Sequence, residues 1–198
     1  KYSNSLDTCG TGGDGLKTLN ISTTVALLLS SVGIPIAKHG NRAASSDSGS
    51  SDIIGKLNIK SEKSEFRLHQ NIKKNKFTYL NAPLFYPDLA KVAHVRKLIQ
   101  TKTIFNYMGP TLNPLGAKYQ ILGTINKSSA QIMTKILSRI NLKGFNVFYS
   151  HDGLDEISLF SPTTFFIKKD MKIIKKTVSN KIYNKYFSKI PNFKDIKG

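Results

Sequence analysis

The sequence predicts an α/β fold built around a largely parallel sheet. Short apolar runs that are typical of buried strands alternate with helical patterns through the first 150 residues. A glycine-rich loop, GTGGDG, stands near the start of the chain and precedes a helical pattern, which is the order found at phosphate-binding loops. With 198 residues, 39% of them hydrophobic, the chain can bury one good-sized core.

The first elements follow from periodicity and capping residues. Residues 22–33 (STTVALLLSSVG) predict a helix that is apolar nearly all round and therefore buried, with Asn20 or Ser22 at its start and Gly33 at its end. Residues 34–40 (IPIAKHG) predict a short buried strand, which a polar loop connects to a helix at 51–57. A polar helical pattern spans 60–76, a strand is predicted at 77–83, and a third helix at 88–100.

The second half continues the alternation. Residues 103–116 (TIFNYMGPTLNPLG) hold two prolines and two glycines, which predict a turn-rich segment without regular structure. Strands are predicted at 119–125 and 144–150, on either side of an amphipathic helix at 128–140 with Ile132, Ile136, Leu137 and Ile140 on one face. Residues 163–178 predict a hairpin, and the last fifteen residues show little pattern.

The net charge of +18 raises the question of nucleic-acid binding. Arginine occurs at only four positions, and the lysines are scattered through the whole chain. Specific nucleic-acid sites rely on the arginine fork and on interleaved aromatic residues, and no such cluster is present in the sequence. We therefore favour a compositional drift towards lysine over nucleic-acid binding, and a multiply charged anionic substrate would also suit the positive field.

The cysteine count and the longest apolar stretch predict the compartment of the protein and its relation to membranes. Cys9 is the single cysteine, which excludes an internal disulfide and fits a reducing compartment, so we expect the cytoplasm. The longest apolar stretch, 25–37, is interrupted by serine, glycine and proline, so neither a membrane span nor a signal peptide is predicted. The chain begins with Lys1 and the glycine loop starts within ten residues of it, so we expect a segment of a longer chain.

The glycine loop satisfies G-x-G-x-x-G, yet it fits neither familiar nucleotide-binding pattern. A Rossmann unit needs an acid about twenty residues later to hold the ribose, and here no acid follows Asp14 until Asp47. A P-loop needs lysine directly after the last glycine, whereas Leu16 stands there. The loop still offers convergent N–H groups to a phosphate, and Asp14 would require a ribose hydroxyl or a magnesium ion beside it. A simple tight turn is the alternative.

A second loop suited to anions follows the strand predicted at 34–40. Lys38, His39, Asn41 and Arg42 lie at its carboxyl end, where open α/β sheets bind ligands, and a run of small donors including Ser45, Ser46 and Ser50 follows. Two such loops at neighbouring strand ends predict a substrate with two phosphate groups. His39 by itself is equally typical of a structural histidine.

Acidic residues cluster in HDGLDEIS, residues 151–158, immediately after the strand predicted at 144–150. Asp155 and Glu156 are typical either of a solvated surface pair or of a magnesium site at a strand end. Arg96 falls on the apolar stripe of the helix predicted at 88–100 and needs an anionic partner there, which is either a structural carboxylate or a substrate carboxylate.

Four motifs together resemble the anthranilate phosphoribosyltransferase family of tryptophan biosynthesis. They are GTGGDG with the following Thr18 and NIST, AKHGNR with the serines up to Asp52, VR with the later TIFN, GP and NP, and DGLDEIS. Their order and spacing match from about Asp7 to Ser158, roughly three quarters of the chain.

The resemblance implies a nucleoside phosphorylase/phosphoribosyltransferase-type central sheet with flanking helices. It implies transfer of ribose 5-phosphate from phosphoribosyl diphosphate (PRPP) to the amine of anthranilate, with Mg²⁺ and with release of diphosphate. Lys38, Asp155 and Glu156 would be catalytic, Ser22, Asp155 and Glu156 would bind the metal, and Gly10, Asn41 and Arg96 would contact anthranilate. PRPP would be held by Gly10, Gly13, Asp14, Thr18, Asn20, Ile21, Ser22, Thr23, Lys38, His39, Gly40, Asn41, Arg42, Ala43, Ala44, Ser45, Ser46 and Ser50.

The sequence departs from the family pattern in several places. Tyr86 stands where the family commonly has histidine, and Asp47 where lysine is common. The helices that normally precede the first motif and close the family's domain are expected to be missing, which takes away part of the small helical domain. Family members usually form homodimers through those first helices, so the assembly of this chain is left open.

We expect residues 1–160 to form the α/β domain that binds PRPP and anthranilate, with a helical segment at about 60–105. Residues 161–198 would be a divergent hairpin and tail of the same domain. Two alternatives remain at this point, a non-catalytic nucleic-acid-binding relative and a pyrimidine nucleoside phosphorylase of the same general fold.

Overall fold

The computed structural model describes residues 4–12, 19–41, 49–91 and 103–187. The strands are β1 (Leu6–Gly10), β2 (Ile36–Gly40), β3 (Phe77–Asn81), β4 (Tyr119–Thr124), β5 (Gly144–Ser150), β6 (Thr163–Lys169) and β7 (Lys172–Val178). The helices are α1 (Ile21–Ser31), α2 (Ser50–Lys56), α3 (Glu65–Asn75), α4 (Ala82–Phe85), α5 (Pro87–Lys91), α7 (Ile104–Met108) and α8 (Lys127–Arg139), with 3-10 turns η1 (Gly109–Thr111) and η2 (Asn180–Lys185).

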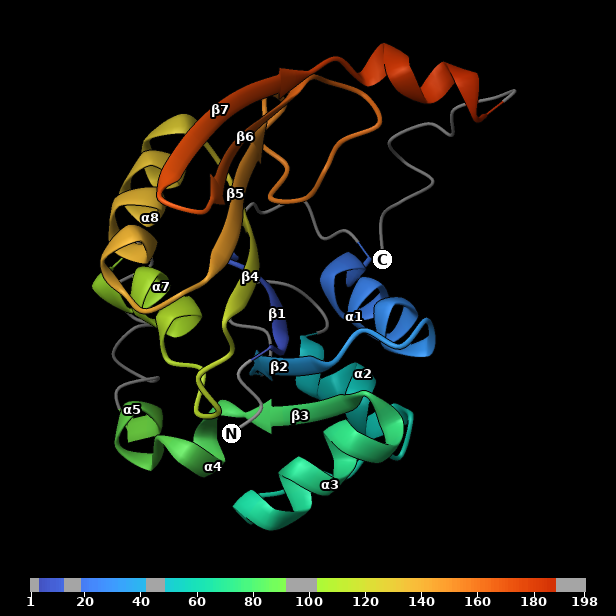
Figure 1. Cartoon of the computed structure of the whole chain (residues 1–198), viewed down its shortest axis with the longest axis vertical. Coiled ribbons are helices and arrows are strands. Elements are labelled where there is room, and N and C mark those ends of the chain that lie inside the picture. The colour runs from blue at the N-terminus through green and yellow to red at the C-terminus, as the bar shows by residue number, and fades with distance from the viewer. Residues whose placement is uncertain (1–3, 13–18, 42–48, 92–102, 188–198) are drawn as a thin grey trace.

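All of these strands form one sheet in the order β3-β2-β1-β4-β5-β6-β7 (Figure 1). The first five in this order run parallel, while β6 is antiparallel to β5 and β7 to β6. The largely parallel α/β sheet predicted from the alternating pattern is therefore confirmed. Because β1 to β5 are parallel, the loops that follow their carboxyl ends leave from a common edge of the sheet.

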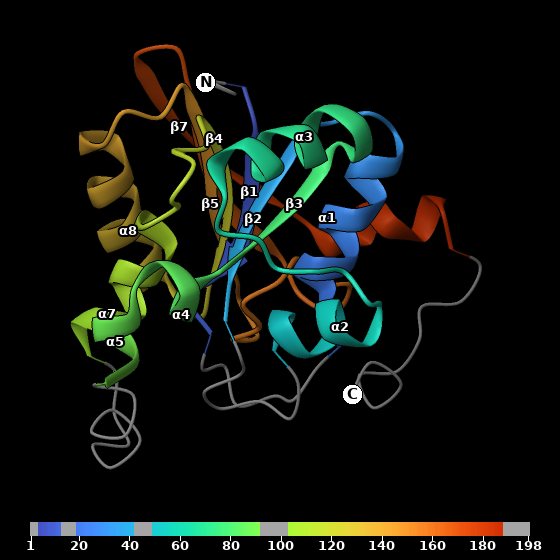
Figure 2. The ribbon, with the colours of Figure 1, turned by 90° about the horizontal axis from the view of Figure 1, so that it is seen from below.

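Helices cover both faces of the sheet. On one face, Ala26 of α1 and Ile54 of α2 pack with Ile36 and Tyr79. On the other face, α3 packs against β2 and β3, and α8 packs against β4 and β5. Figure 2 shows α1 and α2 on one side of the strands, and α4, α5, α7 and α8 on the opposite side. The two layers make the hydrophobic core that holds the strand ends in place.

Helix α1 is shorter and more exposed than its sequence predicts. Asn20 caps its start by accepting a hydrogen bond from the Thr23 amide, as expected. The prediction of a helix buried all round is wrong, because Leu28 is 63% exposed and only Thr23 and Ala26 are buried in α1. The sheet contacts a single side of the helix, and no described element covers the other side (Figure 1).

Helix α8 has the predicted position but a different buried face. Ala130, Met133 and Leu137 are fully buried against the sheet. Ile132 and Ile140, which were predicted to face the core, are 40% and 36% exposed. Either stripe has helical spacing, so only the packing against β4 and β5 decides which one is buried.

Residues 103–116 contain more regular structure than their prolines suggest. The predicted absence of regular structure is wrong for α7 and η1, because Thr103 and Asn106 form a capping box and Pro110 lies in the first turn of η1, where no amide donor is needed. The strand predicted at 77–83 ends at Asn81, and residues 82–85 form α4. Of the helix predicted at 88–100, α5 covers the described start, and residues 92–100 lie outside the described part.

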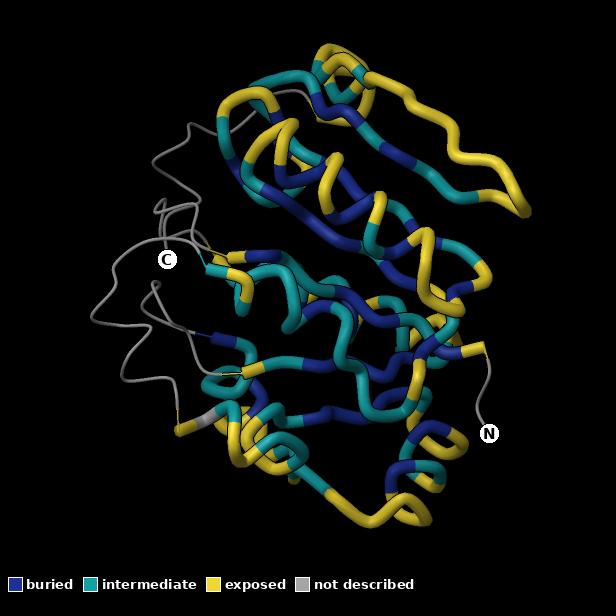
Figure 3. Tube along the Cα trace, turned by 90° about the vertical axis from the view of Figure 1, so that its left-hand side faces the viewer, coloured by how far each residue is buried: buried dark blue, intermediate teal, exposed yellow. Residues whose placement is uncertain are grey.

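The predicted hairpin at 163–178 is confirmed as β6 and β7. Strand β7 forms the outer edge of the sheet, and its residues from Lys172 to Thr177 are all exposed, as Figure 3 shows next to the buried central strands. Over the described ranges, every helix is too short or too polar to span a bilayer.

Candidate functional site

Loops from four strands meet at the carboxyl edge of the sheet, and they carry most of the predicted site residues. Strand β1 ends at Gly10, and β2 ends at Gly40 and is followed by Asn41. Helix α1 starts with the cap Asn20 and the residues Ile21 to Thr23, and α2 starts at Ser50. Lys38 and His39 lie in β2, and Asp155 and Glu156 follow β5. Nine predicted residues lie outside the described part of the chain: Gly13, Asp14, Thr18, Arg42, Ala43, Ala44, Ser45, Ser46 and Arg96.

Asp155 and Glu156, called the carboxylate pair below, point towards the loop between β1 and α1. Asp155 Oδ2 accepts a hydrogen bond of 3.2 Å from the Gly12 amide, and Glu156 Oε1 accepts one of 3.2 Å from the Ser22 amide. The fold therefore brings together the first and the last of the sequence motifs. Ser22, Asp155 and Glu156, predicted as metal ligands from separate motifs, lie together at the start of α1.

Two glycines give the carboxylate pair room to approach the strand ends. A Cβ atom on Gly10 would lie 2.7 Å from Asp155 Oδ2, closer than real Cβ contacts. A Cβ atom on Gly123 would overlap the carbonyl oxygen of Asp155. Gly10 and Gly123 are partners in the register of β1 and β4, so both sit under the same loop. A larger residue at Gly123 would push the backbone of that loop away, whereas one at Gly10 would displace the Asp155 carboxylate.

Lys38 lies below the start of α1, and its side chain is almost completely buried. Its Nζ donates to the Thr8 carbonyl oxygen at 2.6 Å and reaches Ser22 Oγ at 3.4 Å. Burial lowers the pKa of Lys38, while the negative charges of Asp7 and Glu156 act in the opposite direction. The ammonium group thus places positive charge beside the Ser22 hydroxyl at the start of α1.

The start of α2 is packed closely against the end of β2. Ser50 Oγ donates to the Asn41 carbonyl oxygen at 3.1 Å and lies 3.0 Å from the Tyr79 hydroxyl. A Cβ atom on Gly40 would overlap Ser50 Oγ. The close approach of α2 therefore requires glycine at position 40, which is one of the predicted site residues. Burial raises the pKa of Tyr79.

A cavity of about 320 Å³ opens on the other face of the sheet, at the same edge. Its walls come from β1, β2, α4, α5, α7 and the turn after α7. Residues that line it include Gly10, His39, Asn41, Tyr86, Gly109 and Leu112. The volume suits a small planar ligand.

His39 presents one unused ring nitrogen in this cavity. Its Nδ1 donates to the Gly109 carbonyl oxygen at 3.2 Å, while the buried Nε2 has no partner among the described residues. Because a carbonyl oxygen can only accept, the proton belongs on Nδ1, and Nε2 is an acceptor. Burial lowers the pKa of His39, so the ring is neutral near pH 7.

Tyr86 forms a wall of the same cavity. Its hydroxyl donates to the Leu112 carbonyl oxygen at 2.8 Å, and its ring meets His39 edge to face with centroids 6.0 Å apart. Burial raises the pKa of Tyr86. Where the family commonly has histidine, this chain thus has a tyrosine that ties α4 to the turn after α7.

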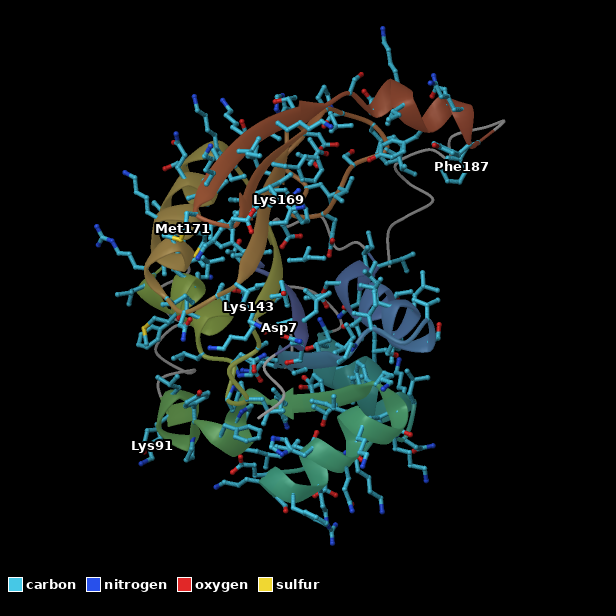
Figure 4. All side chains as sticks on the ribbon, viewed as in Figure 1. Asp7, Lys91, Lys143, Lys169, Met171 and Phe187 are labelled. Atoms are coloured by element: carbon cyan, nitrogen blue, oxygen red, sulfur yellow. The ribbon has the colours of Figure 1, made fainter. Side chains whose placement is uncertain are left out.

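Asp7, which Figure 4 shows near the middle of the molecule, was not selected from the sequence, although it lines the cavity. It is fully buried and accepts hydrogen bonds from the His39 amide at 3.1 Å and from Asn113 Nδ2 at 2.9 Å. Desolvation by burial raises its pKa. The sequence of β1, LDTCG, has too few apolar residues to mark Asp7 as buried, so only the fold reveals its role.

Comparison with known proteins identifies the family. Residues 2–182 match the model of the family described as "Glycosyl transferase family, a/b domain". The chain belongs to this glycosyl transferase family. A curated relative from Pelagibacter ubique named anthranilate phosphoribosyltransferase is 45% identical over 168 residues, which are 85% of this chain and 51% of the relative.

Solved structures agree with this assignment. Anthranilate phosphoribosyltransferase from Thermus thermophilus matches with a TM-score of 0.83 and 33% identity, over 98% of this chain and 56% of the other. The Saccharomyces cerevisiae enzyme in complex with PRPP and Mg matches with a TM-score of 0.74 and 31% identity, over 89% and 49%. The resemblance and the fold expected from the motifs are thereby confirmed. This glycosyl transferase family chain spans about half the length of the curated relatives it matches.

The donor set of this family member fits a magnesium ion. Asp155, Glu156 and the Ser22 hydroxyl offer hard oxygen ligands, and Mg²⁺ is usually held by one or two carboxylates together with substrate phosphates. In the ranges that the structure describes, no group of three or more His, Cys, Asp and Glu side chains could hold a metal by itself.

Gly123 is a second residue of the site that sequence reasoning missed. It interrupts the apolar pattern of β4, and an isolated glycine inside a strand often marks a close approach of another backbone. The carbonyl oxygen of Asp155 makes that approach. The signal was thus present in the sequence, but the partner could be known only from the fold.

Proposed function

We propose that the chain carries the catalytic site of an anthranilate phosphoribosyltransferase. This pentosyltransferase would transfer the phosphoribosyl group of PRPP to anthranilate and give N-(5-phosphoribosyl)anthranilate and diphosphate, the second step of tryptophan biosynthesis. The names of the relatives support the proposal, as does the PRPP complex of the yeast enzyme. We further propose that it acts in the cytoplasm, while assembly as a homodimer stays a prediction.

The position of Gly10 is the observation that carries the proposal. One side of Gly10 lines the cavity, and a Cβ atom on its other side would meet the Asp155 carboxylate. A ligand in the cavity and a ligand at the carboxylate pair would therefore meet across this one residue. That is the arrangement that a transfer between two substrates requires.

The two sides of Gly10 suit the two substrates. PRPP is proposed to lie over the start of α1, where backbone amides, the Lys38 ammonium and the carboxylate pair converge. Anthranilate is proposed to lie in the cavity, where the His39 ring and Tyr86 supply flat walls. Asn41 lines the cavity, and Arg96 is proposed to meet the carboxylate of anthranilate.

The chemistry needs positioning more than it needs acids and bases. The bond between the anomeric carbon and the diphosphate oxygen breaks with its electron pair on diphosphate. The amine nitrogen of anthranilate forms the new bond to carbon and releases one proton. Lys38, whose Nζ lies 3.4 Å from Ser22 Oγ, stabilises the negative charge that develops on the leaving group. Mg²⁺, held by Ser22, Asp155 and Glu156, supplies further neutralisation of the diphosphate when it is bound.

The other predicted residues keep their assigned roles in this proposal. Gly12 joins them, because its amide lies beside Asp155. PRPP contacts are proposed for Gly10, Gly13, Asp14, Thr18, the residues from Asn20 to Thr23, the residues from Lys38 to Ser46, and Ser50.

Calorimetric titration with PRPP, in the presence and absence of Mg²⁺, tests the proposal directly. We expect binding that is markedly tighter with Mg²⁺, and we expect a D155A/E156A double variant to lose the metal dependence while it keeps its fold by circular dichroism. Product formation from PRPP and anthranilate would then be followed in a fluorescence assay. The proposal is wrong if the unaltered chain binds no PRPP under either condition, or if the folded double variant is fully active.

A further inference from the structure

The segment between β5 and β6 carries the carboxylate pair but contains no helix or strand. Residues 151–162 form turns and bends. Such a segment would hold two carboxylates in one place only if its own hydrogen bonds fixed it. Those hydrogen bonds involve residues that the proposed reaction does not use.

Three buried hydroxyl groups fix the base of the segment. Ser150 is 1% exposed, Ser158 0% and Thr163 2%. Ser150 Oγ donates to the Glu156 carbonyl oxygen at 2.7 Å, and it accepts from the Ser158 amide at 3.0 Å. Thr163 Oγ1 lies 2.8 Å from Ser150 Oγ and forms the third hydrogen bond of this hydroxyl group. The backbone of Glu156 is therefore fastened to the end of β5.

Asp152 and Ser158 close the segment from the other side. Ser158 Oγ donates to Asp152 Oδ2 at 2.6 Å, and the Leu154 amide donates to Asp152 Oδ1 at 3.3 Å. Ser158 Oγ also accepts from the amides of Phe160 and Ser161. The hydrogen bond between Asp152 and Ser158 thus spans residues 153–157, which include the carboxylate pair.

We propose that Asp152 and Ser158 are positioning residues for the carboxylate pair: their hydrogen bond closes residues 153–157 into a turn that holds Asp155 and Glu156 against Gly12 and Ser22. The inference rests on the proposed function, in which that pair serves Mg²⁺ and PRPP. Both oxygens of Asp152 are bonded within its own turn, so Asp152 supports the pair and is not a third ligand.

Because Asp152 lies at the surface, its replacement can disturb the position of the carboxylate pair without disturbing the folded core. Asp152 is exposed, so its replacement leaves no cavity in the core. The buried bonds of Ser150 and Thr163 remain in place and keep the segment attached to the sheet. Loss of the Asp152 carboxylate should therefore loosen residues 153–157 while the rest of the fold is unchanged. Partners of this outer kind typically change metal affinity by about 10–100-fold.

The test compares Asp152→Ala and Asp152→Asn with a matched control, Asp88→Ala, which also removes an exposed carboxylate bonded within its own turn. PRPP titrations at several Mg²⁺ concentrations give the binding constants. Hydrogen exchange of residues 153–157 in the free protein gives a second readout that is independent of activity.

We expect Asp152→Ala to weaken Mg²⁺-dependent PRPP binding by about 10–100-fold and to speed amide exchange in 153–157, with a melting temperature lowered by only about 2–4 °C. Asp152→Asn should recover most of the binding, because its Oδ1 can still accept the hydrogen bond from Ser158 Oγ, and only the longer bond of 3.3 Å from the Leu154 amide is lost. Ser158→Ala should also weaken this binding, with a larger loss of stability because the Phe160 and Ser161 amides lose their acceptor, and the double variant should show little additional loss of binding.

Three results would overturn the inference. Asp152→Ala could bind PRPP as well as Asp88→Ala does, which would exclude positioning. Asp152→Asn could be as weak as Asp152→Ala, which would show that the negative charge and not the hydrogen bond matters. Amide exchange in 153–157 could be unchanged in Asp152→Ala, which would show that the hydrogen bond does not order the turn. Failure of the unaltered chain to bind PRPP with Mg²⁺ would instead overturn the proposed function, and the inference with it.

Discussion

Replacement of Gly10 by alanine should damage the site with almost no effect on the fold. The backbone of Gly10 does not have a positive φ, so alanine is compatible with its conformation. Its Cβ atom would lie 2.7 Å from Asp155 Oδ2, whereas ordinary contacts begin at 3.4 Å. The carboxylate must therefore retreat by about 0.7 Å, and because it is the end of a side chain this should cost only about 1 kcal/mol of stability.

The same displacement is large for a magnesium ligand. Metal–oxygen distances are expected within about 0.2 Å of their ideal values, so a carboxylate moved by about 0.7 Å no longer serves the ion. We therefore expect Mg²⁺-dependent PRPP affinity to fall by about 10–100-fold.

Calorimetry with PRPP and Mg²⁺, together with thermal denaturation, measures both effects. Gly55→Ala is a matched control, because Gly55 lies in α2 and a Cβ atom there would meet nothing within 4 Å. This control should bind PRPP normally and gain up to about 1 kcal/mol of stability. If Gly10→Ala binds PRPP within about threefold of the unaltered chain, the reasoning about the contact with Asp155 is refuted.

Three further predictions concern stability. Because the pKa of His39 is lowered below 6.5 by burial, the unfolded chain takes up the proton first as the pH falls, so stability should decline from about pH 6.5 downward. Denaturant unfolding at about pH 7.5 and 5 should show a smaller decline in His39→Gln, and an equal decline would contradict this. Tyr86→Phe removes the hydroxyl that bonds Leu112 and should cost about 1 kcal/mol in the same measurement, whereas no loss would mean that this bond is not formed in solution. Leu137→Ala should cost about 2–5 kcal/mol and Ile132→Ala much less, and similar costs would show that a different face of α8 is buried.

Most of the sheet could be predicted from the sequence because its strands have strong local signals. The strands around Lys38, Tyr79 and Val147 are short apolar runs bounded by glycine, asparagine or serine, and each was predicted within two residues of its bounds. The start of α1 was equally well marked in the sequence. Asn20 was one of the two caps expected there, and it does cap the helix. Local propensity and tertiary packing agree in these elements.

The predictions that failed depended on which neighbour a helix meets. The apolar residues of α1 and α8 are spread over more than one face, and only contact with the sheet decides that Ala26 and Met133 are buried while Leu28 and Ile132 are exposed. The helix α7 was missed because Pro110 was taken as a breaker, although it stands after the helix end, in the first turn of η1. The pattern of one segment cannot reveal the element that covers it.

The sequence by itself determined the chemistry of the loops: the glycines of GTGGDG, the basic residues after β2, and the carboxylate pair after β5. It also determined that these loops follow parallel strands and so share an edge. Only the tertiary structure decided which groups meet, since Asp155 and Gly12 are 143 positions apart and the contact depends on the missing Cβ atoms of Gly10 and Gly123. The tertiary structure likewise buried Lys38 and Asp7, because burial depends on what packs above and below the sheet, which no local pattern encodes.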